Sequence, residues 1–129
     1  MNLWLLAIHN LVRWAVLLSG AYSFLRASTG LLARGGWLPA DQKAARIYPI
    51  VLDVQVVLGL ATWFALHPPV PPHASAAVVA LVMAHAGTIY AKRTKTVRTK
   101  FQAVALLHGL SLLLIAVRLD WSAPLIPHF

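Results

Sequence analysis

Long apolar runs separated by short polar segments predict four membrane-spanning helices. Each run is close to the length of about 20 residues that an α-helix needs to cross the hydrocarbon core of a bilayer. The predicted spans are residues 3–25, 47–66, 74–91 and 101–119. The pattern therefore predicts an all-α integral membrane protein, a four-transmembrane-helix bundle with up-down-up-down topology, in a single transmembrane domain over residues 1–129.

The segments between the predicted spans differ in character. The first, residues 26–46, is expected to form a loop in which Asp41 caps a short helical turn. Pro49 then falls in the first turn of the second span, where a missing amide proton costs little. The link 67–73 contains four prolines and is expected to be stiff and extended. The basic segment 92–100 joins the last two spans.

Composition supports a bilayer rather than water as the solvent. Of the 129 residues, 60% are hydrophobic and only 11% are charged, which is too little charge for the surface of a soluble domain. The chain has no cysteine, so disulfides, thiolate metal sites and a covalently attached c-type haem are excluded. The first apolar run lacks a basic start and a small-residue cleavage site, so we expect a retained span rather than a signal peptide.

The net charge of +8 reflects topology rather than nucleic-acid binding. Nine of the eleven Lys and Arg residues fall within segments 26–46 and 92–100. This matches the positive-inside bias of membrane proteins, whereas a nucleic-acid reader would carry its basic residues on a folded surface. We expect a multi-pass protein of the cell inner (cytoplasmic) membrane, with both basic loops cytoplasmic and both termini outside. The expected partners are the lipid bilayer and a larger membrane protein complex or a homo-oligomer.

Two histidines lie at matching depth in the last two predicted spans. His85 is seven residues before Lys92, and His108 is eight residues after Lys100. At the helical rise per residue, both imidazoles sit about 10–12 Å from the same membrane face. They could be the axial ligands of one haem, handle protons at a quinone site, or only hydrogen-bond across the bundle.

Two further polar residues lie in the second span. Asp53 shares the depth of the two histidines and could orient an imidazole by accepting its second N–H. Asp53, His85 and His108 together also contain enough ligands for zinc, although no water-filled route to them is evident. Gln55 points nearly opposite Asp53, because two residues turn a helix by about 200°, and its face is expected to serve helix packing.

Arg13 lies near the middle of the first span, and His9 lies one turn earlier on the same face. A charge at this depth needs a partner or a use. Arg13 could neutralise an anionic cofactor group such as a haem propionate, or contact a quinone oxygen. The alternatives are an ion pair with Asp53 or extension of the side chain toward the interface. His9 would serve a second polar site in the outer half of the membrane.

Three short motifs resemble a known group of proteins. They are His9-Asn-Leu-Val-Arg13-Trp14, Gln55-x-x-x-Gly59-Leu60 and Ala84-His85-Ala-Gly87, with a basic stretch after the last. Over most of its length the chain resembles short bacterial four-helix membrane proteins labelled cytochrome-b-like. The resemblance implies a b-type haem and a role beside a respiratory or photosynthetic enzyme. It extends to four residues: His9, Arg13, Gln55 and His85. The group carries a histidine where this chain has Asp53, and His108 rests on its depth alone.

The favoured prediction is electron transfer through haem b, with electrons exchanged with a quinone. His85 and His108 would be the axial metal ligands, Arg13 would balance cofactor charge, and Asp53 would tune the site or relay protons. The rival is a cofactor-free accessory subunit of a larger respiratory or photosynthetic membrane complex, because 129 residues with short loops leave little machinery for catalysis. A small transporter is disfavoured, because no span shows the central Pro or Gly pair of a broken helix.

Overall fold

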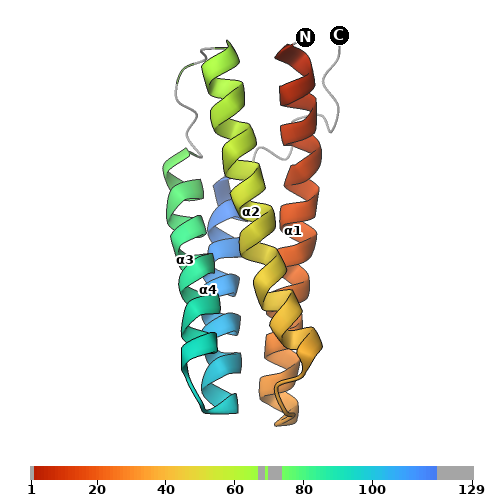
Figure 1. The fold of residues 1–129 in the computed structure, drawn as a ribbon, viewed down its shortest axis with the longest axis vertical. Coiled ribbons are helices and arrows are strands. Elements are labelled where there is room, and N and C mark those ends of the chain that lie inside the picture. The colour runs from red at the N-terminus through yellow and green to blue at the C-terminus, as the bar shows by residue number, and fades with distance from the viewer. Residues whose placement is uncertain (1, 67–68, 70–73, 119–129) are drawn as a thin grey trace.

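The computed structural model describes residues 2–66, 69 and 74–118, and these form four α-helices (Figure 1). The helices are α1 (Asn2–Ala33), α2 (Pro39–Leu66), α3 (Ala74–Arg93) and α4 (Val97–Arg118). All four are long and apolar enough to cross a membrane. Helix α1 packs on α2 and α4, and α3 packs on α4 and less extensively on α2, so the helices form one bundle. The all-α prediction is confirmed for the described residues.

The bundle buries small side chains and exposes large ones. Most of its buried hydrophobic residues are alanines, and Ala80 and Ala84 are fully buried. Large apolar side chains point outward from every helix; Leu18 is 70% exposed, Val82 63% and Leu106 62%. Small residues let helix backbones approach closely, which is how helices associate in lipid, where burial of large apolar side chains gives no driving force. The outer surface is therefore suited to hydrocarbon.

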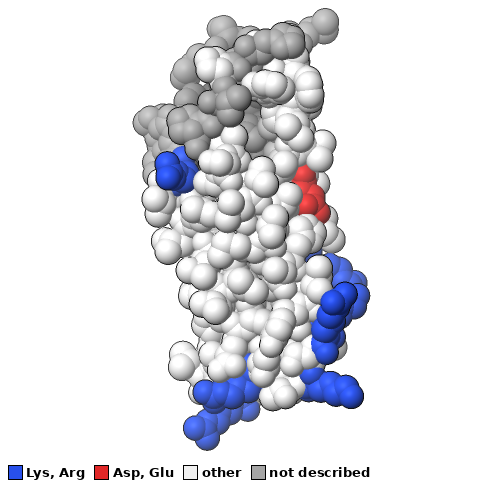
Figure 2. Space-filling view, turned by 90° about the vertical axis from the view of Figure 1, so that its left-hand side faces the viewer, with Lys and Arg blue, Asp and Glu red and all other residues white. Residues whose placement is uncertain are grey.

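Basic side chains gather at one end of the molecule. The connections 34–38 and 94–96 both lie at the lower end in Figure 1. The rotated surface view shows most of the visible Lys and Arg side chains around that end, below a broad surface that carries one basic and one acidic group at its margins (Figure 2). The end that holds both connections is called the basic end below.

The first basic segment is mostly helical, and the prediction of a loop over 26–46 is wrong. Helix α1 continues to Ala33, and α2 already begins at Pro39. The polar residues in this segment end the apolar run without ending the helix. Hydropathy therefore marked the edge of the apolar surface rather than the end of either helix.

Asp41 holds the junction between α1 and α2. Arg26 donates from Nε to Asp41 Oδ1 at 2.6 Å, which links the two helices. The other oxygen, Oδ2, accepts the amide proton of Leu38 at 2.7 Å. Asp41 thus caps the start of α2, as expected, from its third helical position, and Pro39 occupies the first.

Candidate functional site

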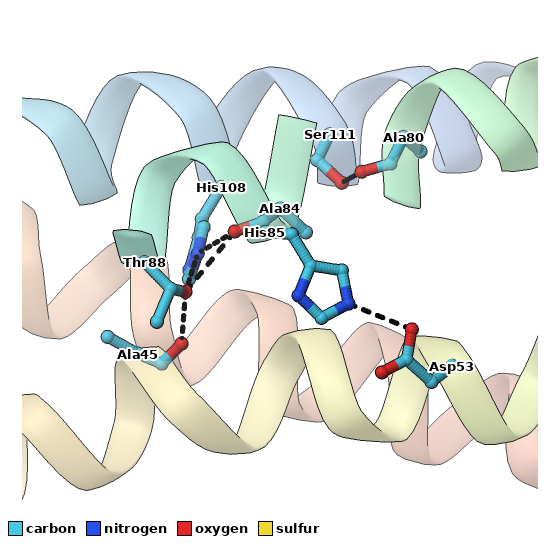
Figure 3. Close-up of polar contacts among 8 residues, drawn as sticks. All are labelled: Ala45, Asp53, Ala80, Ala84, His85, Thr88, His108 and Ser111. Atoms are coloured by element: carbon cyan, nitrogen blue, oxygen red, sulfur yellow. Dashed lines mark hydrogen bonds and ion pairs between the residues drawn. The ribbon is translucent and has the colours of Figure 1, made fainter. Parts of the chain in front are cut away.

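His108 is fully buried inside the bundle, with 0% of its surface exposed. Its Nε2 lies 2.9 Å from the carbonyl oxygen of Ala84 and 3.1 Å from Thr88 Oγ1, both on α3 (Figure 3). Because a carbonyl oxygen only accepts, Nε2 must carry the proton. Nδ1 is then an acceptor, and Ser23 of α1 donates its hydroxyl proton to it at 2.7 Å. Both nitrogens of a neutral imidazole are therefore occupied by protein groups.

Thr88 extends this network to α2 through a proline. Pro49 was predicted for the first turn of its helix, but it lies buried in the interior of α2. A proline has no amide proton, so the carbonyl of Ala45, four residues earlier, loses its partner within the helix. Thr88 supplies the missing donor, with Oγ1 2.6 Å from the Ala45 oxygen (Figure 3). All four helices are thus joined through His108, Thr88 and Ser23.

A second buried hydrogen-bond chain lies beside the first. The Ser111 hydroxyl donates to the carbonyl of Ala80 at 2.7 Å, so the Tyr48 hydroxyl must donate to Ser111 Oγ, at 2.8 Å. The rings of Tyr48 and His108 pack edge to face, with their centroids 5.1 Å apart. Such bonds between helices are the polar contacts that hold a bundle together where no water is present.

His85 contacts Asp53 on the outside of the bundle. His85 Nε2 donates to Asp53 Oδ1 at 2.8 Å, which joins α3 to α2 (Figure 3). The side chains of His85 and Asp53 are 42% and 45% exposed. Their neighbours along the two helices include the exposed valines Val54, Val57 and Val82. The contact agrees with the predicted orientation of an imidazole by Asp53, and it leaves a polar pair on an apolar surface.

The two histidines do not fit the predicted axial pair of a haem. Axial ligation needs an unprotonated nitrogen from each ring, directed at one iron. His108 uses both nitrogens in hydrogen bonds inside the bundle, whereas His85 turns outward to Asp53. The backbone of Gly87 lies directly against the ring of His108, because a Cβ added there would lie 3.0 Å from His108 Cδ2. The haem stays a prediction, without a fitting ligand pair in this arrangement.

The described residues also contain no group of three or more His, Cys, Asp or Glu side chains placed to hold a metal ion. The considered zinc set of Asp53, His85 and His108 is therefore not assembled among them. Asp53 and His85 meet at the surface, while the ring of His108 lies in the interior.

Of the remaining predicted site residues, His9 lies at the interface between α1 and α2. A Cβ added at Gly59 of α2 would lie 3.3 Å from His9 Cε1, so the imidazole of His9 rests on this glycine. Gln55, one turn earlier on the same face, has a buried Oε1 without a hydrogen-bond partner among the described residues. Arg13 is 7% exposed, and its guanidinium lies 5.4 Å from the ring centroid of Trp14. Two of the three motifs behind the resemblance thus meet at one interface.

Sequence reasoning missed four polar residues of the interior: Ser23, Tyr48, Thr88 and Ser111. Two of them had a usable signal. For Thr88 the signal is Pro49, because a proline inside a helix frees the carbonyl four residues earlier, and this carbonyl then needs a donor from a neighbouring helix. Ser111 also lies three residues after His108 and so shares its face of α4.

Comparison of the chain with protein-family models, with curated proteins and with solved structures finds no match. The candidate site therefore rests on the geometry of its residues. The sequence also predicts that His67, His73 and His128, in the proline-rich link and the C-terminal tail, face solvent, and these three residues lie outside the described part of the chain.

Proposed function

We propose that the chain is an accessory subunit of a larger respiratory or photosynthetic complex in the bacterial inner membrane. Its helices would run up-down-up-down, with segments 26–46 and 92–100 on the cytoplasmic side and both termini outside. The length and apolar character of all four helices support membrane insertion. The gathering of Lys and Arg at the basic end supports this orientation, because cytoplasmic loops carry an excess of both.

The observation that carries the accessory role is the half-exposed pair of Asp53 and His85. Insertion scales give a cost of at least about 2.5–3.5 kcal/mol for an ionised side chain such as Asp at membrane depth. Asp53 Oδ1 and His85 Nε2 bind one another, so Oδ2 and Nδ1 remain to bind groups from outside the chain. A polar surface on a partner would satisfy both atoms and remove the pair from lipid. The exposed valines around the pair would form the apolar rim of that contact.

The test is purification of the tagged chain from native membranes in a mild detergent, followed by native mass measurement. The wild-type chain should be recovered with partner subunits or further copies of itself. The double variant Asp53→Leu/His85→Leu should lose most of the partner while keeping its helical content, because its surface then suits lipid. Val57→Leu, on the same surface, is the matched control and should keep the partner. Recovery of the wild-type chain as a lone monomer would contradict the proposal.

The same pair favours a second candidate, a quinone site. A carboxylate and an imidazole joined by one hydrogen bond and reachable from the bilayer can donate or accept a proton at a quinone oxygen. Bound quinone should then co-purify with the wild-type chain and be lost from His85→Gln. An optical spectrum of the same sample tests for haem, which would show a band on reduction. If partner subunits co-purify with the chain but neither quinone nor haem is found, the result favours the accessory role over the quinone site.

A further inference from the structure

A cavity of about 410 Å³ opens at the basic end, between the last turn of α1 and the first turn of α4. Arg34 lines it from the end of α1, and Arg98 lines it from the start of α4. Gly30 and Leu31 of α1 and Phe101 of α4 are its apolar lining residues, called the apolar wall below. The cavity is thus lined by two arginines together with apolar residues.

No described carboxylate neutralises the two arginines of the cavity. Asp41 binds Arg26, and Asp53 binds His85. None of the residues that line the cavity is acidic. The positive charge of Arg34 and Arg98 is therefore available to an anion.

The backbone holds Arg34 in an unusual conformation. Its φ is 54°, the left-handed region that a glycine would adopt at this position after a helix. The amide of Gly35 donates to the carbonyl of Gly30 at 3.1 Å, which closes the end of α1 in the usual manner. Arg34 thus lines the cavity from a position where glycine would be more stable.

The first turn of α4 forms part of the same wall. The amide of Lys100 donates to the carbonyl of Thr96 at 3.0 Å, which is the first bond of the helix. The amide protons of the residues just after Thr96 therefore have no partner within the helix, and Val97 and Arg98 among them line the cavity. Helix N-termini carry partial positive charge, which adds to that of the two arginines.

The apolar wall is fixed by close packing. A Cβ added at Gly30 would lie 2.5 Å from the ring of Phe101, so the ring rests directly on this glycine. The Phe101 ring also packs against the ring of Trp37, with their centroids 5.1 Å apart. Because Phe101 is itself only 2% exposed, it backs the cavity from inside, and the half-buried Leu31 offers the apolar surface.

We propose that this cavity binds the phosphate group of an anionic phospholipid, with the guanidinium groups of Arg34 and Arg98 on the phosphate and the apolar wall against the glycerol and upper acyl chain. The cavity lies where the apolar surface gives way to the basic end, which is the level of the headgroups in the proposed orientation. This inference rests on the proposed membrane insertion, but not on the accessory role.

The test compares the lipids retained by three forms of the full chain. Each is extracted from vesicles of phosphatidylcholine and phosphatidylglycerol in equal parts, and bound lipid is measured by native mass spectrometry. Arg34→Gly/Arg98→Gln should lower the retention of phosphatidylglycerol by about tenfold, as expected for two lost charge contacts. Lys92→Gln/Lys95→Gln removes the same charge at the same end but outside the cavity, and it should retain phosphatidylglycerol as the wild type does.

Three outcomes would overturn the inference. If the two double variants lose phosphatidylglycerol equally, its retention depends on overall charge alone. If the Arg34/Arg98 variant retains as much phosphatidylglycerol as the wild type, the cavity is not a lipid site. The third outcome concerns the midpoint of thermal unfolding of the chain in phosphatidylcholine nanodiscs. If inorganic phosphate raises this midpoint as much as phosphatidylglycerol does, the ligand is a free anion rather than a lipid.

Arg34→Gly relieves the backbone strain at this residue, so the variant is expected to fold. Failure of the wild-type chain to enter the vesicles would instead refute the membrane topology proposed above.

Discussion

The imidazole of His108 binds Ser23 of α1 and Ala84 of α3 directly, and it reaches Ala45 of α2 through Thr88. Each of these bonds suits the neutral ring, with its proton on Nε2. A protonated ring would place a second N–H against Ser23, whose hydroxyl would then have to turn and accept. His108 therefore acts as a connector of helices rather than as an open ligand position.

The bond between Thr88 and Ala45 exists because Pro49 removes the competing amide, and this makes a double-mutant cycle informative. Thr88→Val should destabilise the bundle by about 1 kcal/mol, since the freed carbonyl would lose its donor. Pro49→Ala restores the amide four residues along, so the same threonine change should cost less in that background. Thermal unfolding in detergent micelles measures all four proteins. Equal costs of Thr88→Val in the two backgrounds would contradict this role.

The depth of the polar residues could be predicted from the sequence, but their directions could not. Asp53 and His85 were assigned to one layer by counting from the basic segments, and they do meet. His108 was assigned to the same layer, yet it turns inward to hydrogen bonds rather than toward His85. Counting along a helix gives its rise, whereas rotation about its axis depends on which neighbours pack against it.

At the scale of the helices, Gly20 sets how closely α1 approaches its two neighbours. A Cβ added there would lie 2.8 Å from Tyr48 Cε1 of α2 and 2.8 Å from Leu112 Cδ1 of α4. The first of these atoms belongs to a ring whose hydroxyl is already bound to Ser111. The ring is therefore restrained from moving away, and α1 would have to shift instead.

Gly20→Ala should destabilise the bundle by about 1–3 kcal/mol through this overpacking, in spite of the better helix propensity of alanine. Gly36→Ala is the matched control, because a Cβ at Gly36 meets nothing within 4 Å. The measurement is the midpoint of thermal unfolding followed by helical circular dichroism. A Gly20 variant as stable as the Gly36 variant would show that the three helices do not meet this closely.

The four helices of the described residues were predictable, because apolar runs of this length have few other uses. The extent of α1 and α2 was not. Arg26 and Asp41 read as loop residues in the sequence, but their ion pair lies between two continuous helices. The polar residues Arg26 and Asp41 end an apolar surface, whereas α1 itself ends only where Arg34 takes a left-handed conformation.

At the scale of the whole molecule, the absence of cysteine allows the proposed topology to be tested with single introduced thiols. Gly36→Cys and Lys95→Cys place a thiol in each connection at the basic end. Both should resist a membrane-impermeant maleimide in sealed spheroplasts and react after lysis. Ser75→Cys, at the exposed start of α3, should react before lysis. If Gly36→Cys is labelled in sealed spheroplasts, either the orientation of the chain is the opposite of the one proposed or the proposed spans are wrong.

The alanine-rich interior and the bulky exterior described above also determine which changes the chain can accept. In a water-soluble bundle, surface positions accept most side chains, and interior positions accept most apolar ones of similar size. In the proposed membrane setting, larger side chains at the fully buried Ala80 and Ala84 would separate the helices, whereas Leu18 or Val82 could be exchanged for other bulky apolar residues at little cost. Variation during evolution should therefore be limited by volume on the inside and by polarity on the outside.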